Sequence, residues 1–60
     1  MKKILIIEDD IVFGRSIGNW LKKQGMECRH VTALAPAKKS LASEEFDLVL
    51  ADLRLPDGNS

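Results

Sequence analysis

The sequence contains little cysteine, no excess charge and no long apolar run. Cys28 is the single cysteine among 60 residues, so no disulfide can form within the chain and a reducing compartment is expected. Nine basic side chains balance nine acidic ones, which gives no electrostatic reason to expect direct nucleic-acid binding. The apolar run at residues 4–7 is too short for a signal peptide or a membrane span. We therefore expect a soluble cytoplasmic segment without a membrane partner.

What is present is the composition of a folded domain. Hydrophobic residues make up 45% of the chain and charged residues 30%, far from the composition of a disordered segment. A chain of this length is near the lower limit for folding alone, because it buries only about 60% of its unfolded surface.

Three apolar runs predict three strands. Residues 4–7 are aliphatic without interruption, which is typical of a strand buried on both faces of a parallel sheet. Residues 26–31 alternate more weakly, as expected of an edge strand, with Cys28 and His30 on one face. Residues 46–51 predict the third strand.

Two helical patterns separate these strands. The first follows the acidic triplet at residues 8–10 and ends at Gly25, a common residue just beyond a helix. Its expected inner face consists of Phe13, Ile17, Trp20, Leu21 and Gln24. Thr32 is the candidate N-cap of the second helix, and Pro36 is tolerated there because it lies in the first turn.

The resulting order, β-α-β-α-β, predicts an α/β fold with a parallel sheet and right-handed crossovers. If the second and third strands flank the first, the winding direction reverses between the first and third strands. Ligands of open α/β sheets bind at such a switch point, beyond the carboxyl ends of the strands.

Carboxylate side chains follow the two strands that meet at this predicted switch point. Glu8, Asp9 and Asp10 follow the first predicted strand, and Asp52 follows the third. Neighbouring strands are about 4.8 Å apart, so these groups can converge on one small volume. Ionised carboxylates that share such a volume need a cation, and oxygen donors with open positions suit Mg²⁺. A carboxylate beside that ion can attack phosphorus and form an aspartyl phosphate.

Each acidic feature also has a plain structural interpretation. A triplet of acids after a strand is often the solvated start of a helix, where negative charge is favoured. Asp52 alone could be a turn or cap residue. Their joint position at a predicted switch point favours a shared site.

Two segments of the chain carry a family resemblance. Ile6-Ile7-Glu8-Asp9-Asp10 and the stretch from Asp47 to Gly58 (Asp-Leu-Val-Leu-Ala-Asp-Leu-Arg-Leu-Pro-Asp-Gly) resemble the hallmark segments of the receiver domain of two-component response regulators. The resemblance covers the whole chain. It implies a flavodoxin-like receiver fold with strand order 2-1-3, in which a phosphoacceptor switch, rather than an enzyme, takes a phosphoryl group from a sensor histidine kinase or a small phosphodonor.

The resemblance also implies roles for individual residues. Asp52 would be the phosphoacceptor, Asp9 a direct Mg²⁺ ligand and Glu8 a ligand through water. Arg54 would contribute its backbone carbonyl to the same ion. Asp10 matches a helix N-terminal charge just past the acidic pair. Pro56 and Gly58 match the turn over the site, and Ser60 stands where the family usually has glycine.

The 60 residues correspond to the N-terminal half of such a domain, and strands four and five with helices three to five are absent from them. We therefore expect the third strand to have a bare edge that pairs with a second copy or a complementing fragment. The alternative function is an inactive structural, self-associating fragment. A Mg²⁺-dependent phosphohydrolase with an aspartyl nucleophile is disfavoured, because Arg54 stands where those enzymes usually have a second aspartate. The parent protein could bind DNA through another domain.

Three further residues are expected to have structural roles. Cys28 is interpreted as a small core hydrophobe and Trp20 as part of the core. His30 is expected to be exposed to solvent and far from the carboxylates.

Overall fold

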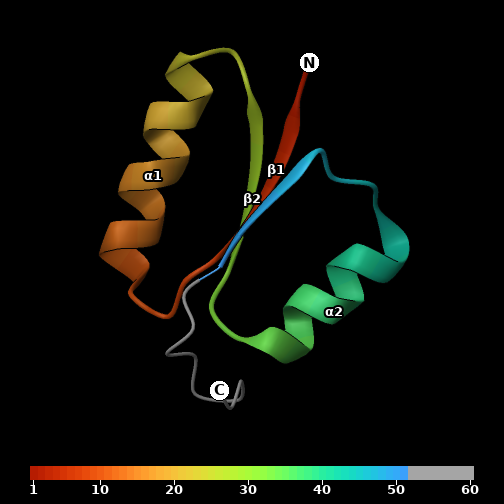
Figure 1. Cartoon of the computed structure of the whole chain (residues 1–60). Helices are drawn as coiled ribbons and strands as arrows, with labels where there is room; N and C mark the ends of the chain where they lie inside the picture. Colours follow the sequence, from red (N-terminus) through yellow and green to blue (C-terminus); the bar gives the residue numbers. More distant parts are fainter. Residues whose placement is uncertain (52–60) are drawn as a thin grey trace.

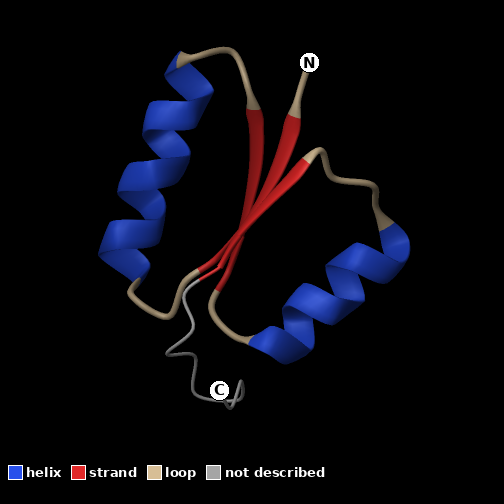
Figure 2. Ribbon diagram, viewed as in Figure 1, coloured by secondary structure: helices blue, strands red, loops and turns tan. Residues whose placement is uncertain are grey.

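The computed structural model describes residues 1–51, and residues 52–60 lie outside this description. Three strands alternate with two helices along the chain (Figure 1). The elements are β1 (Lys3–Ile7), α1 (Ile11–Lys23), β2 (Glu27–Val31), α2 (Leu34–Ser43) and β3 (Leu48–Ala51). Figure 2 shows the two helices on opposite sides of the sheet. The predicted β-α-β-α-β order is confirmed.

The three strands form one parallel sheet in the order β2-β1-β3. β1 is central, with Ile7 opposite Val31 of β2 on one side and opposite Ala51 of β3 on the other. A central strand between two helices is buried on both faces, which explains why residues 4–7 of β1 are all aliphatic. The predicted order 2-1-3 and the edge position of β2 are therefore confirmed.

Alternate residues of β1 build two separate core clusters, one under each helix. Leu5 and Ile7 pack with Ala37 of α2, whereas Ile4 and Ile6 pack with Leu21 of α1. Strand side chains alternate between faces, so a single strand supplies both clusters. The stability of the chain consequently depends on β1 more than on any other described element.

The ends of the two helices are formed differently. Asp10 is the N-cap of α1, and its carboxylate accepts a hydrogen bond of 3.0 Å from the backbone N–H of Phe13. Gly25 follows α1 with a φ of 85°, which a residue without a side chain adopts readily. The N-cap of α2 is Ala33, without a side-chain hydrogen bond, so the expectation for Thr32 was wrong. The backbone is extended at Ala33, and Thr32 lies one residue too early to cap the helix.

The inner face of α1 differs in part from the predicted one. Trp20 is 60% exposed and Phe13 is also exposed, so their assignment to the core was wrong. Leu21 is buried as predicted and Ile17 packs against its cluster, whereas the other buried residues of α1 are Gly14 and Gly18. Because two glycines leave room for the helix to approach the sheet closely, the glycine side of α1 turns inward and the aromatic side chains stay at the rim.

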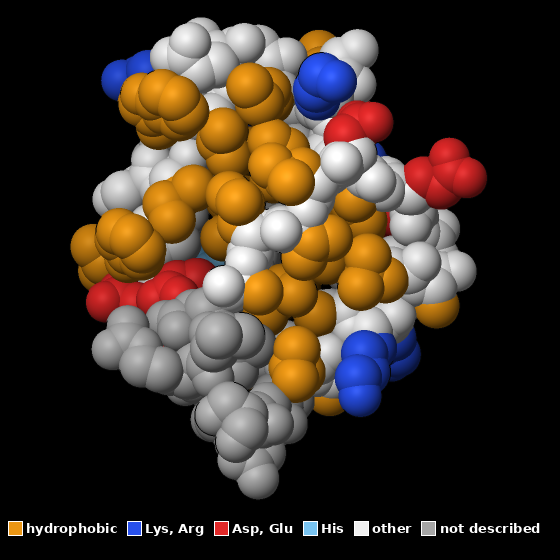
Figure 3. Space-filling view, in the orientation of Figure 1, with side chains coloured by type: hydrophobic (Ala, Val, Ile, Leu, Met, Phe, Trp, Pro, Cys, Tyr) orange, Lys and Arg blue, Asp and Glu red, His pale blue; other side chains and the backbone are white. Residues whose placement is uncertain are grey.

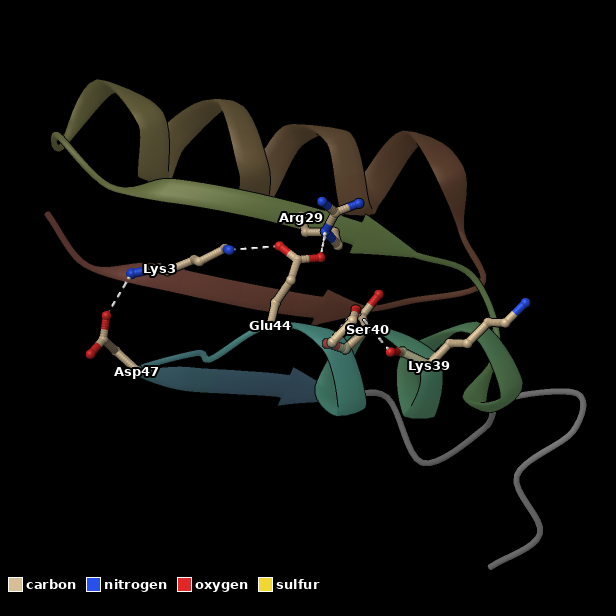
Figure 4. Close-up of polar contacts among 7 residues, drawn as sticks. Lys3, Arg29, Lys39, Ser40, Glu44 and Asp47 are labelled. Atoms are coloured by element: carbon tan, nitrogen blue, oxygen red, sulfur yellow. Dashed lines mark hydrogen bonds and ion pairs between the residues drawn. The ribbon is translucent and has the colours of Figure 1, made fainter.

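Ion pairs join several elements near the N-terminal end of β1 (Figure 4). Glu44, just after α2, lies 2.6 Å from Lys3 Nζ and 2.8 Å from Arg29 Nε. The backbone N–H of Lys3 donates to the Asp47 carboxylate at 2.7 Å. The hydrogen bond from Lys3, with a smaller contribution from Arg29, holds the pKa of Glu44 below its ordinary value. These contacts tie α2 and the start of β3 to β1 and β2.

Neither α1 nor α2, the helices within residues 1–51, has the length and apolar character needed to cross a membrane.

Candidate functional site

The candidate site lies where β1 and β3 end. Their last paired residues are Ile7 and Ala51, so the two strands finish at the same level of the sheet. Glu8 follows β1 directly, and Asp52 is the next residue in the sequence after β3. Asp52, Arg54, Pro56, Gly58 and Ser60 all fall outside the described residues, and their expected roles stay predictions.

The three acids after β1 have three different environments. Glu8 is only 6% exposed, and its backbone N–H donates to the Val31 carbonyl oxygen at 3.0 Å. Asp9 is exposed. Asp10 serves as the N-cap of α1, as its expected role at the helix N-terminus requires. Glu8 and Asp9 are therefore the two acids of the triplet that are not used to cap the helix.

An open hollow connects Glu8 with the end of β3. It has a volume of about 270 Å³ and lies between α1, β1 and β3. Glu8 lines it together with Leu50 and Ala51 of β3 and Phe13 of α1. Glu8 and the last residues of β3 thus share one space at the carboxyl end of the sheet.

His30 lies against the acidic triplet and not in solvent. Its Nε2 is 2.9 Å from the backbone carbonyl oxygen of Glu8, and the contact is partly buried. The expectation that His30 is exposed and distant from the carboxylates was wrong. His30 pairs with Ile6 of β1 near the end of the sheet, on the face covered by α1. The alternation with Cys28 predicts on which face of β2 His30 lies. Gly14 on the neighbouring helix is the sequence signal that an imidazole fits against that face.

Cys28 has the structural role predicted for it. It is partly buried and packs against the cluster of Ile4, Ile6 and Leu21. Burial raises the pKa of its thiol, which disfavours the reactive thiolate. Cys28 therefore belongs to the core under α1 and not to the candidate site.

The donors at the end of β1 suit a hard divalent cation. Glu8 and Asp9 offer carboxylate oxygens, and Mg²⁺ in proteins commonly takes one or two carboxylates with water and phosphate oxygens. Residues 1–51 contain no group of three or more histidine, cysteine, aspartate or glutamate residues that could hold a metal ion. Within the described residues, Glu8 and Asp9 thus offer a pair of carboxylates whose chemistry fits Mg²⁺.

Residues 4–59 match the family described as the response regulator receiver domain. The chain therefore belongs to the receiver domains of two-component response regulators, and its three parallel strands in the order 2-1-3 are a partial receiver fold. These domains are signalling modules rather than enzymes, their family typically uses Mg²⁺, and its phosphodonor partners are histidine kinases.

Individual relatives are much longer than the chain. The swarming motility regulation protein RssB of Serratia marcescens is 41% identical over 56 residues, which cover 93% of this chain and 26% of that protein. The transcriptional regulatory protein QseB of Escherichia coli is 39% identical, over 90% of this chain and 25% of its own length. The response regulator receiver protein CpdR of Brucella abortus is 37% identical, over 95% of this chain and 48% of its own length. The chain spans about a quarter to a half of these relatives. No solved structure gave a significant match.

Proposed function

We propose that this chain is the phosphoacceptor segment of a two-component phosphorelay and that Asp52 receives the phosphoryl group. The observation that supports this proposal best is the shared level of β1 and β3, where Ile7 pairs with Ala51. Acids that directly follow two adjacent parallel strands lie within the reach of one ion. The proposed donor is a sensor histidine kinase or a small phosphodonor.

The proposed chemistry is a nucleophilic transfer to a carboxylate. Asp9 directly, Glu8 through water, Asp52 and the backbone carbonyl of Arg54 would hold Mg²⁺, and the bound ion would neutralise charge on the transferring phosphoryl group. A carboxylate oxygen of Asp52 attacks phosphorus, and the bond between phosphorus and the donor breaks as the leaving group takes the electron pair. Asp52 then carries an acyl phosphate.

The proposal is tested by phosphorylating the chain with acetyl phosphate and Mg²⁺. We expect a hydroxylamine-labile adduct of one phosphoryl group by intact-mass measurement, and we expect the substitution Asp52→Asn to abolish it. Glu45→Gln is the matched control, because Glu45 is an exposed acid outside the candidate site and its loss should leave the adduct intact. An adduct of equal yield in Asp52→Asn would contradict the assignment.

The free edge of β3 supports a second proposal, that this strand pairs with a second copy or a complementing fragment. Within residues 1–51, β3 pairs with β1 alone, and Leu48 is 50% exposed. Figure 3 shows hydrophobic side chains gathered on the face that β3 fronts in Figure 1. An exposed apolar strand edge is a template for pairing with another strand.

Sedimentation equilibrium of the 60-residue chain tests this pairing. We expect the average mass to exceed the monomer mass of 6.7 kDa and to rise with concentration. Leu48→Lys should return the chain to a monomer, because a charge at a strand edge opposes pairing. A compact, cooperatively folded monomer at every concentration would rule the pairing out and would remove the support for a purely structural, self-associating function.

We further propose that the chain acts within a longer regulator. QseB is named a transcriptional regulatory protein, and a matching role for a longer protein containing this chain would place DNA binding in another domain. The proposed setting is the cytoplasm, the compartment expected from the single cysteine.

A further inference from the structure

Residues of β2 hold both backbone polar groups of Glu8, the N–H and the carbonyl oxygen. The Glu8 N–H donates to the carbonyl oxygen of Val31 at 3.0 Å, which extends the β1–β2 pairing by one residue. The Glu8 carbonyl oxygen lies 2.9 Å from His30 Nε2. A carbonyl oxygen only accepts hydrogen bonds, so Nε2 carries the proton and donates it. The second of these two bonds comes from a side chain, and a substitution can remove it.

Fixing that carbonyl also fixes Asp9. The carbonyl of Glu8 and the N–H of Asp9 belong to one planar peptide unit. A hydrogen bond to its oxygen therefore restricts the rotation that would swing the Asp9 backbone away from the end of the sheet. His30 thus acts on both acids of the candidate site through the backbone that they share.

The imidazole itself is locked in place by α1. A Cβ at Gly14 would overlap Nε2 and Cε1 of His30, so the ring lies directly against the backbone of the first turn of α1. The Gly14 N–H donates to the Asp10 carbonyl oxygen at 2.9 Å. The ring therefore contacts both ends of the short connection between β1 and α1, Glu8 on one side and the first helical turn on the other.

We propose that His30 is a positioning residue for the Mg²⁺ ligands Glu8 and Asp9. This inference rests on the proposed function, because it deepens the assignment of that acidic pair. Groups that orient ligands by hydrogen bonding commonly change metal affinity by about 10–100-fold when they are removed. A residue that only filled the space beneath Gly14 would change stability but would not set the direction of the ligands.

Substitutions that separate volume from hydrogen bonding test the inference. The 60-residue chain is titrated with Mg²⁺ alone by calorimetry, and its folding is followed by circular dichroism. His30→Phe keeps a ring but removes the donor, and we expect about tenfold weaker Mg²⁺ binding. His30→Gln keeps an N–H at a similar reach and should retain affinity within about threefold. If the phenylalanine variant does not fold, His30→Leu takes its place.

The outcomes distinguish this inference from the proposed function. Equal Mg²⁺ affinity in wild type, His30→Phe and His30→Gln would overturn the role of His30 and leave the acidic pair in place. Equal losses in both variants would also overturn it, because the retained N–H would then have no effect. If Asp9→Asn binds Mg²⁺ as tightly as wild type, the acidic pair is not the metal site and both proposals fail.

Discussion

Replacement of Leu5 by alanine is expected to unfold a large share of the molecules at 25 °C. Leu5 is 0% exposed at the centre of β1, where it packs with Ile7 and Ala37 and with partly buried residues that include Phe46. Removing a buried leucine side chain costs about 2–5 kcal/mol, because the cavity collapses only in part. A core of this size rarely supplies more than about 3–5 kcal/mol. The expected loss is therefore comparable to the whole stability of the chain.

The measurement is urea unfolding followed by far-ultraviolet circular dichroism. Leu41→Ala is the matched control, since the chemical change is the same and Leu41 on α2 is 47% exposed. We expect the control to lose less than about 1 kcal/mol, as substitutions away from buried features usually do. Similar losses in the two variants would mean that the cluster under α2 does not carry the stability assigned to it.

Gly14→Ala is expected to destabilise the chain although alanine favours helices. Alanine in a helix interior is better than glycine by about 1 kcal/mol. At Gly14, however, the added Cβ overlaps the His30 ring, and such overpacking typically costs about 1–3 kcal/mol. The net expectation is a loss of stability, together with displacement of the imidazole from the Glu8 carbonyl.

Two companion variants isolate the cause. A Cβ at Gly18 would meet Ile6 Cδ1 at 3.7 Å, an ordinary contact, so Gly18→Ala should stabilise the chain by up to about 1 kcal/mol. In a double-mutant cycle, Gly14→Ala should cost less in a His30→Ala background than in wild type, because the overlapping ring is gone. If Gly14→Ala and Gly18→Ala shift the urea midpoint equally upward, the close packing of His30 is refuted.

The sheet was predictable because its signal is local and strong. The aliphatic run of β1 has no polar alternative, and its burial on both faces follows directly from a parallel, helix-covered sheet. The third strand was predicted from residue 46 but begins at Leu48. Phe46 packs on the core under α2, and the Asp47 carboxylate accepts a hydrogen bond from the backbone N–H of Lys3. Both residues are therefore held in place without belonging to the strand.

The rotation of α1 and the environment of His30 were not predictable in the same way. Apolar periodicity favours Phe13 and Trp20 as inward residues, because it depends on the positions of apolar side chains. Glycine has no side chain and does not contribute to it. The closest approach of two backbones occurs where side chains are missing, which is the Gly14 and Gly18 side. His30 fits against that bare backbone, and a polar residue satisfied by a carbonyl leaves no hydrophobic pattern in the sequence.

Of the candidate site, the sequence indicated the acids but not their separate environments. The triplet pattern alone does not distinguish Glu8, which is nearly buried, from Asp9, which is exposed. That difference arises from the strand end and from the capping of α1 by Asp10, so it depends on tertiary packing.

The central position of β1 also constrains the order in which the chain can assemble. The contact of Ile4 with Cys28 closes a shorter loop than its contact with Leu48. The longer loop is nearly twice the length, which by itself adds only about 0.6 kcal/mol of closure entropy. Once β1, α1 and β2 have docked, however, only the segment from β2 through α2 to β3 has to close before β3 can pair with β1. During synthesis β1 leaves the ribosome before β2 and β3, and its second edge stays unpaired until β3 has been translated.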